Sequence, residues 1–300
     1  MTSPSRGLLA GVAFTALLLA IGAFLPKWLS FLITMAASHA LVSLGIVLLM
    51  RGGVVSFGQG LVFAVGGYAG ALAYNRLGLT DAVGLTLLGG AAATLVAAPF
   101  APLLSRYRGI FFAMLTLALS MVTYGALVKT EALGGSDGFN MGRVTLFGQK
   151  LADERVGYVL YCVTLVFAAL LAMLARVYFD STRGLITLAV RENELRVEYL
   201  GGSVRRAMAI NFVLAAFAGG AGGALVVMSL GHIDPNFSYW TTSGEFVFVA
   251  STVLEVVRSF SSLYFPNTWQ LALGLFLLFV IRFLPRGIGS LWFRRPGSGR

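Results

Sequence analysis

Residues 186–206, ITLAVRENELRVEYLGGSVRR, form the one long charged stretch of a chain that is otherwise strongly apolar. Arg191, Glu192, Glu194, Arg196 and Glu198 all fall within it, between two apolar runs. An ionised side chain at the centre of a bilayer costs several kcal/mol, so this stretch is expected to lie outside the lipid. A charged and helical connection of this kind indicates a docking element for a soluble partner.

The composition around this stretch predicts an all-α polytopic membrane protein. Of the 300 residues, 58% are hydrophobic and 11% are charged, against roughly 25% charged in an average soluble domain. Long uninterrupted apolar runs exclude a β-barrel, whose strands alternate, and leave helices as the structure that satisfies the backbone in lipid. The net charge of +10 comes largely from arginines at the ends of the apolar runs. It therefore indicates topology and anionic lipid headgroups rather than nucleic acid.

Eight apolar runs have about the 20 residues that a crossing requires. They are 7–25, 29–50, 54–75, 83–104, 109–128, 157–176, 207–230 and 267–285. A further segment, 244–265, is doubtful because it contains Glu245, Glu255 and Arg258. We expect about eight transmembrane helices plus one broken or re-entrant segment, in a single domain covering 1–300.

Arginines in the short connections set the orientation, because such residues favour the cytoplasmic side. This rule places both termini and the loop 183–206 in the cytoplasm. The loop 129–156 is then extracytoplasmic; it is electrically neutral and contains a turn-rich LGGSDG sequence at 133–138.

Within the charged stretch, apolar residues recur at helical spacing. Ile186, Ala189, Val190, Val197 and Leu200 are expected on one face of a helix. Glu192 precedes Arg196 by four positions, the favourable order for an ion pair, and Gly201 and Gly202 supply a C-terminal stop. The pattern alone fits both a docking helix for an ATPase and a solvated loop that only fixes topology.

The sequence RGGVVSFGQG at 51–60 interrupts the start of the third predicted span. Irregular backbone at membrane depth is tolerated only where it is buried in protein or lines a cavity. Ser56 and Gln59 are suited to hydrogen-bond a passing solute or a freed backbone group; the alternative is a tight turn between two spans. The candidate solute pathway comprises Ser56, Phe57, Gly58, Gln59 and Gly60, with Gly135, Ser136, Asp137 and Gly138 of the extracytoplasmic loop.

Two GxxxG patterns indicate close helix packing, because small residues let helix backbones approach one another. They are formed by Gly66 with Gly70 and by Gly219 with Gly223. We expect these glycines to pack helices rather than to contact solute.

No motif in the chain supports catalysis. The phosphate-binding GxxxxGK[ST] and the zinc-binding HExxH are absent. GGSDG at 134–138 has the GxSxG spacing of a nucleophile elbow, but it lies in the turn-rich loop, without the preceding strand that the elbow requires. No catalytic residue, metal ligand or cofactor site is expected. Carboxylates at membrane depth are scarce, which disfavours an ion-coupled secondary carrier or channel, although that remains the alternative function.

Several of these stretches together resemble the LivM-type permeases of branched-chain amino acid ABC transporters. The matching segments are 38–73, 107–122, GGSDGF at 134–139, RGLITLAVRENELRVEYLG at 183–201, and 264–288. They cover roughly residues 35–290 in order, and their combination is more specific than any single piece.

The resemblance implies an importer subunit in a bacterial inner membrane, driven by ATP hydrolysis on other chains. It implies that a relative of the EAA loop docks on the ATPase through Arg191, Glu192, Asn193, Glu194, Val197, Leu200 and Gly201. The expected partners are two P-loop ATPases that bind ATP and magnesium, a second permease of related fold and an extracytoplasmic solute-binding protein. The expected solute is a branched-chain amino acid, with urea, short amides and other small amino acids as alternatives.

The chain departs from this family after Ala250. The family pattern continues there with a glycine-rich stretch resembling GGxGxxxGPxxGA, whereas Ala250 here is followed directly by STVLE at 251–255. The missing length is about 20 residues, one membrane crossing. Our hypothesis is a compromised transporter or a reshaped pathway wall, and a glycine-rich insert after Ala250 should raise assembly or uptake.

Overall fold

The computed structural model describes residues 4–149 and 156–245, and these residues are mostly helical. The predicted span 267–285, the departure after Ala250 and nearly all of 244–265 lie outside the described residues. The long helices are α1 (Pro4–Gly22), α2 (Lys27–Arg51), α3 (Gln59–Leu77), α4 (Ala82–Ala97), α6 (Gly109–Lys129), α7 (Val156–Asp180) and α10 (Val204–Leu230). The shorter elements are α5 (Ala101–Leu104), α8 (Thr182–Glu192), α9 (Glu194–Tyr199), α11 (Thr242–Glu245), η1 (Glu131–Leu133), η2 (Gly135–Asp137), η3 (Pro235–Ser238), β1 (Phe139–Asn140) and β2 (His232–Ile233).

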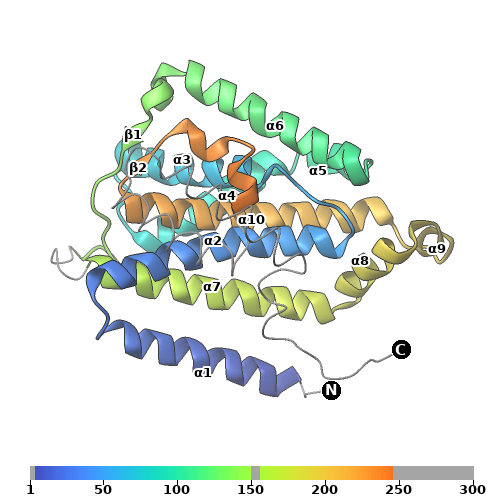
Figure 1. The fold of residues 1–300 in the computed structure, drawn as a ribbon, viewed down its shortest axis with the longest axis horizontal. Coiled ribbons are helices and arrows are strands. Elements are labelled where there is room, and N and C mark those ends of the chain that lie inside the picture. The colour runs from blue at the N-terminus through green and yellow to red at the C-terminus, as the bar shows by residue number, and fades with distance from the viewer. Residues whose placement is uncertain (1–3, 150–155, 246–300) are drawn as a thin grey trace, which may run out of the picture.

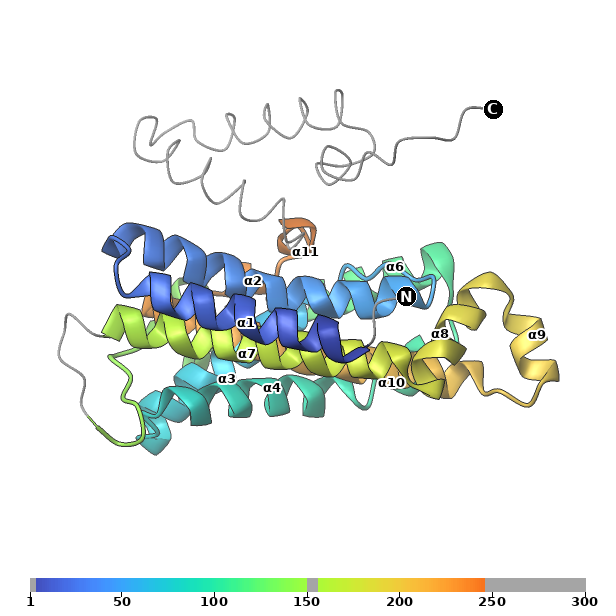
Figure 2. The same cartoon turned by 90° about the horizontal axis from the view of Figure 1, so that it is seen from below.

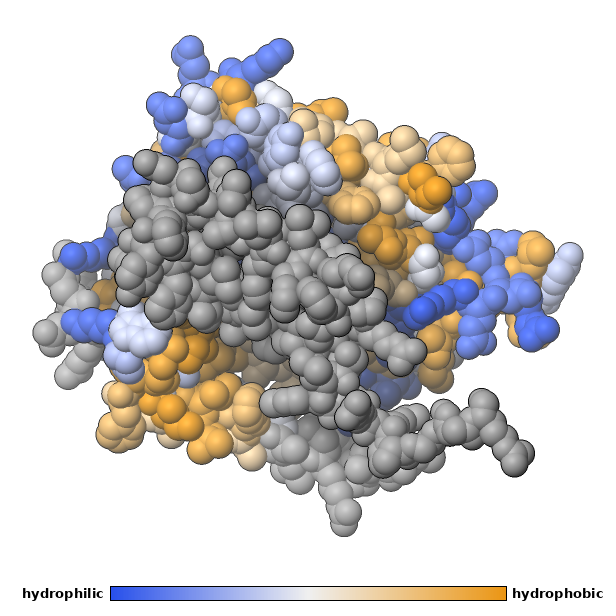
Figure 3. Space-filling model, viewed as in Figure 1, coloured by the Kyte–Doolittle hydropathy of each residue, from blue (hydrophilic) through white to orange (hydrophobic). Residues whose placement is uncertain are grey.

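The long helices run back and forth in one bundle around α10 (Figure 1). α10 packs on α2, α3 and α4, while α7 packs on α2 and on α1. Four helices of the described residues, α2, α6, α7 and α10, are long and apolar enough to cross a membrane. On the part of the surface visible in Figure 3, hydrophilic residues gather at the two ends of the helices and apolar residues lie between them. This distribution is the one expected of a protein embedded in lipid.

Glycines set the spacing of the central helices. A Cβ atom placed on Gly66 of α3 would overlap the carbonyl oxygen of Gly220 in α10, and one on Gly223 would overlap the carbonyl oxygen of Phe63. Gly89 of α4 lies at the same place: a Cβ atom on Gly89 would be 2.9 Å from the carbonyl oxygen of Gly66. α3, α4 and α10 therefore meet backbone to backbone, at a separation that larger residues would prevent.

Two predicted spans have different boundaries in the structure. The third begins at Gln59 rather than at 54, because 52–58 is not helical. The fourth is interrupted between Ala97 and Ala101. Pro99 lies in that interruption and Pro102 just beyond it; proline has no backbone N–H to donate, and its ring clashes with the preceding turn.

The long connection between α6 and α7 is tied to the end of α10 by a small antiparallel ladder. Phe139 of β1 pairs with Ile233 of β2, and Asn140 pairs with His232. Met141 N donates to the carbonyl oxygen of Gly231 over 2.8 Å. This end of the bundle is thus closed by loops, while α8 and α9 occupy the opposite end (Figure 1).

Candidate functional site

The charged stretch folds as two short helices, so its apolar residues do not all share one helical face as predicted. Ser181 caps α8, its Oγ accepting from Gly184 N over 3.3 Å. Asn193 has extended backbone angles, φ −160° and ψ 104°, and its Oδ1 accepts from Arg196 N over 3.0 Å to cap α9. An asparagine that bonds to the backbone ahead of it starts a new helix rather than continuing the old one.

This break changes which residues face the bundle. Val190 and Val197 are buried, as expected, and Ile186 is half-buried. Ala189 and Leu200, predicted on the same face, are exposed because the two helices do not share an axis. The two buried valines belong to an apolar cluster that also includes Val54, Leu104 and Met208.

Polar contacts fix the two helices to the bundle. Arg108, just before α6, forms an ion pair with Glu194 at the start of α9, with 2.5 Å between Nε and Oε1. The buried Asn211 of α10 donates from Nδ2 to Thr187 Oγ1 over 3.3 Å and accepts from the Tyr178 hydroxyl over 2.6 Å. The expected pair of Glu192 with Arg196 is not formed within the described residues, because Asn193 separates them into different helices.

The turn after α2 lies directly against α8, so two segments that were singled out separately are neighbours. Gly53 has a φ of 79°, and a Cβ there would be 3.3 Å from Arg191 Cγ and 3.5 Å from its Cα. Arg51 donates from Nη2 to the carbonyl oxygen of Phe179 over 3.3 Å, and its guanidinium lies 4.4 Å from the centre of the Phe179 ring. A displacement of α8 would therefore push on the chain that leads into α3.

α8 and α9 extend beyond the end of the bundle (Figure 2), and they carry exposed apolar side chains. Tyr199 and Leu200 are 87% and 83% exposed. The other exposed large apolar residues here are Leu185, Leu188 and Leu195. A group of exposed apolar residues among charged ones marks an interaction surface. We call these five residues the hairpin patch.

A second feature is a junction of two irregular segments inside the bundle (Figure 1). Residues 52–58 enter from the α8 end, and residues 231–241 enter from the opposite end. Ser243 joins them: its Oγ donates to the carbonyl oxygen of Phe57 over 2.7 Å and accepts from Gly60 N over 2.9 Å. Gly60 is required here, because the Tyr239 oxygen lies 2.9 Å from its Cβ position.

Hydroxyl groups also bond to further backbone groups of this junction. Phe57 N donates to Thr116 Oγ1 over 3.1 Å, and Ser120 Oγ donates to the carbonyl oxygen of Ser238 over 2.6 Å. Ser56 Oγ accepts from Gly58 N over 3.1 Å. This bond to a freed backbone group is one of the two roles considered for Ser56.

Gln59 is the polar residue of the junction with unused hydrogen-bonding capacity. It is 2% exposed, and its Oε1 has no hydrogen-bond partner among the described residues. This oxygen lies 3.2 Å and 3.3 Å from the Cβ positions of Gly45 and Gly219, in the interior of the bundle. A buried acceptor without a partner is costly unless another group reaches it.

Aromatic rings surround the junction. Phe57 meets Trp240 edge to face at 6.3 Å between centroids, and Tyr124 meets Tyr239 in the same way at 5.3 Å. Sequence reasoning missed the whole 234–243 segment, as well as Thr116 and Ser120. The Asp-Pro-Asn turn at 234–236 was the available signal that the chain does not continue as a helix after α10.

The turn-rich loop adopts the glycine conformations that its sequence suggests. Gly134, Gly135 and Gly138 have φ values of 85°, 57° and 66°. Ser136 Oγ donates to Asp137 Oδ1 over 3.0 Å at the surface. η2, within this loop, contacts η3, and η3 also contacts α3. The two predicted pathway segments, 56–60 and 135–138, are therefore connected through η3.

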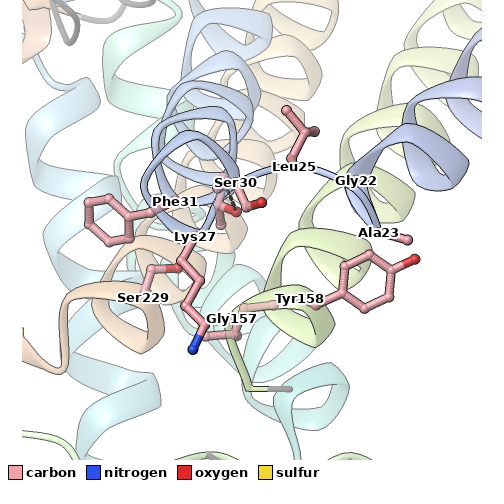
Figure 4. Close-up of a pocket in the computed structure, with 11 residues that line it drawn as sticks. Gly22, Ala23, Leu25, Lys27, Ser30, Phe31, Gly157, Tyr158 and Ser229 are labelled. Carbon is pink, nitrogen blue, oxygen red and sulfur yellow. Dashed lines mark hydrogen bonds between the residues drawn. The ribbon is translucent and has the colours of Figure 1, made fainter. Parts of the chain in front are cut away.

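A cavity of about 610 Å³ opens at the end of the bundle away from α8. Figure 4 shows Lys27 extending toward Gly157, with Ser30, Tyr158 and Ser229 around it. The Tyr158 and Ser229 hydroxyls already donate to the carbonyl oxygens of Leu19 and Leu225. None of the predicted pathway residues lines this cavity.

These features define a polytopic helical membrane protein with a charged hairpin at one end and broken backbone at its core, an arrangement typical of transporters. Residues 28–282 match the family of the branched-chain amino acid transport system permease component, and the chain belongs to this family. The family prediction made from the sequence is confirmed.

Two curated relatives are similar to the chain. Both are high-affinity branched-chain amino acid transport system permease proteins LivM, from Escherichia coli K12 and Salmonella typhimurium LT2. They are 24% and 25% identical over 85% of this chain and 68% of their own length. No solved structure matches the chain.

Proposed function

We propose that the chain is the permease subunit of an ABC importer for branched-chain or related small amino acids. ATP would bind with magnesium to two separate P-loop ATPase subunits and be hydrolysed there. A second related permease and an extracytoplasmic binding protein would complete the assembly. Family membership supports a transport role, and the names of the two LivM relatives support the class of solute.

The observation that most directly supports an ATP-driven mechanism is the hairpin patch. Its apolar residues lie on the two short helices at the end of the bundle, where the described part of the chain leaves them exposed. Below them, Val190, Val197 and Glu194 attach the helices to α6 and α10. A partner pressing on the patch would thus transmit force to the turn at Gly53 and on to α3.

The orientation follows from the basic residues at the hairpin end. Arg51, Arg108 and Arg191 are brought together there by their contacts with Phe179, Glu194 and Gly53. Because short cytoplasmic connections are enriched in arginine, this end faces the cytoplasm, and the N-terminus lies on the same side. Because the C-terminal residues are also rich in arginine, we place the C-terminus on the cytoplasmic side as well. We place the protein in a bacterial inner membrane.

The solute route in this proposal passes the junction at 56–60. Gln59 Oε1 would accept a hydrogen bond from the ammonium group of an amino acid, and the aromatic residues Phe57 and Trp240 would contact an apolar side chain. Residues 135–138 would line its extracytoplasmic entrance. Replacing Gln59 with leucine should change uptake while the ATPases still bind; unchanged uptake kinetics would remove Gln59 from the route.

The test of the assembly is co-purification of the full chain from its native host in mild detergent, with mass-spectrometric identification of bound proteins. We expect two P-loop ATPases and a second permease. Loss of the ATPases in a Tyr199→Ala, Leu200→Ala variant, with the second permease retained, would assign docking to the patch. Isolation of the chain alone, together with uptake that continues without ATP, would contradict the importer and favour a carrier.

A further inference from the structure

α1 leaves a groove on the side of the bundle away from the junction. It packs on α7, and a cavity of about 510 Å³ remains between α1, α2 and α7. The lining residues recur every three or four positions along each helix, so each helix contributes one continuous face. Small residues, among them Gly11, Ala40, Ala168 and Ala172, create the space between the helices.

The groove has the length of a lipid tail in one leaflet. Its α7 face extends from Leu165 to Arg176, a rise of about 16 Å at 1.5 Å per residue. The hydrocarbon core of a bilayer is about 30 Å thick, so this length is roughly half of it. At the Leu165 end of the groove, Leu18, Ala37 and Leu165 pack in one cluster.

Three of the residues that line the groove are polar: Thr15, Ser43 and Arg176. The hydroxyls of Thr15 and Ser43 are engaged with the carbonyl oxygens of Gly11 and His39, at 2.9 Å and 3.0 Å. Arg176 is exposed and has no hydrogen bond or ion pair with any described residue. It lies one turn before the end of α7, at the level where a membrane helix meets the headgroups. No acidic residue is among those described as lining the groove.

We propose that this groove binds an anionic phospholipid, with one acyl chain between α1, α2 and α7 and its phosphate on the Arg176 guanidinium. An arginine that no described residue pairs with, at the end of an apolar groove, matches a ligand with an anionic head and a hydrocarbon tail. A guanidinium group binds phosphate through two parallel hydrogen bonds. In a zwitterionic headgroup, the positive ammonium group near the phosphate repels the guanidinium, so an anionic headgroup is preferred. The bound lipid would hold α1 to the bundle from the hairpin side.

The first test is native mass spectrometry of the full chain with its co-purifying partners, in mild detergent with phosphatidylglycerol or phosphatidylcholine of the same chain length. We expect the wild-type protein to retain phosphatidylglycerol more strongly than phosphatidylcholine. Arg176→Gln should lower that retention about fivefold, the effect of one basic residue near an anionic headgroup. Arg176→Lys should keep most of it. Ala168→Phe, which fills the tail channel, should displace both lipids.

Arg106→Gln is the matched control, because Arg106 is exposed at the same end of the bundle but lies outside the groove. It should leave retention unchanged. Equal loss in Arg106→Gln and Arg176→Gln would mean general surface attraction and would overturn the proposal, as would no loss in Arg176→Gln.

A photoreactive phosphatidylglycerol with a diazirine in its acyl chain gives an independent readout. Labelled peptides should come from α1, α2 and α7, and unlabelled phosphatidylglycerol should compete. Labelling spread over all lipid-exposed helices, or crosslinking of a partner protein to the groove in place of lipid, would refute the site.

Discussion

Gly66 of α3 and Gly220 of α10 are in direct backbone contact, with the Gly220 carbonyl oxygen in the space that a Gly66 side chain would need. A Cβ atom placed on Gly220 would in turn lie 2.7 Å from the carbonyl oxygen of Gly89 in α4. Three helices therefore meet backbone to backbone at this point, with only the small side chains of Ala93 and Ala224 beside the contact. Contacts of this type take the place of the hydrophobic driving force that is missing between helices in lipid.

Replacing Gly66 with alanine should destabilise the protein by about 1–3 kcal/mol, the usual cost of overpacking a tight contact. The measurement is the thermal unfolding midpoint in detergent. Gly125→Ala is the control, because Gly125 is also inside a helix but has no atom within 4 Å of its Cβ position. A melting temperature that drops equally in both variants would show that the contact is not the cause.

The hairpin patch should dominate the affinity for the ATPase. Leu200→Asp should weaken binding by about 2 kcal/mol, roughly 30-fold in Kd, if Leu200 is a central interface residue. The readout is ATPase binding to the reconstituted permease. Leu77→Asp is a suitable control, since Leu77 is 70% exposed at the end of α3, opposite α8. Comparable weakening by both substitutions would argue against the patch.

The features that depend on local sequence were predictable. The apolar runs predicted the long helices, since crossing a bilayer requires about 20 apolar residues. The glycine at 201 predicted the end of α9, where its φ is 82°. The prediction that the apolar residues of 186–200 share one face failed because Asn193 fits a helix by spacing, while its side chain can instead cap the helix that follows it.

The junction could not be predicted, because its hydroxyl residues resemble many others in the chain. Thr34, Ser38 and Thr86 donate to the carbonyl oxygen four residues earlier in their own helices, which is the usual behaviour of hydroxyls in membrane helices. Ser120 and Ser243 look the same in sequence but bond to segments more than a hundred residues away. Tertiary contact alone distinguishes the two groups.

Removing the Ser243 hydroxyl should loosen the junction. Ser243→Ala leaves Gly60 N–H buried without an acceptor, a loss of about 1–3 kcal/mol. We expect a lower melting temperature and faster hydrogen exchange at residues 57–60, whereas Ser243→Thr should preserve both. Thr130→Ala, at an exposed site where the hydroxyl bonds only within its own turn, is the control. Unchanged exchange at 57–60 in Ser243→Ala would refute the bridging role.

The conformation of Gly201 provides a test of coupling that is free of steric contacts. Its φ of 82° is unfavourable for side chains, yet no atom lies within 4 Å of its Cβ position. Gly201→Val should therefore act through the backbone alone, straining the end of α9 by about 1–2 kcal/mol, whereas Gly201→Asn should be tolerated. In proteoliposomes containing the ATPases, we expect the valine variant to take up less solute per ATP hydrolysed.

Gly148→Val is matched to it, with a φ of 77° and the same empty surroundings in the loop between α6 and α7, and should transport normally. If both valine variants retain the wild-type ratio of uptake to hydrolysis, the end of α9 is not part of the coupling element.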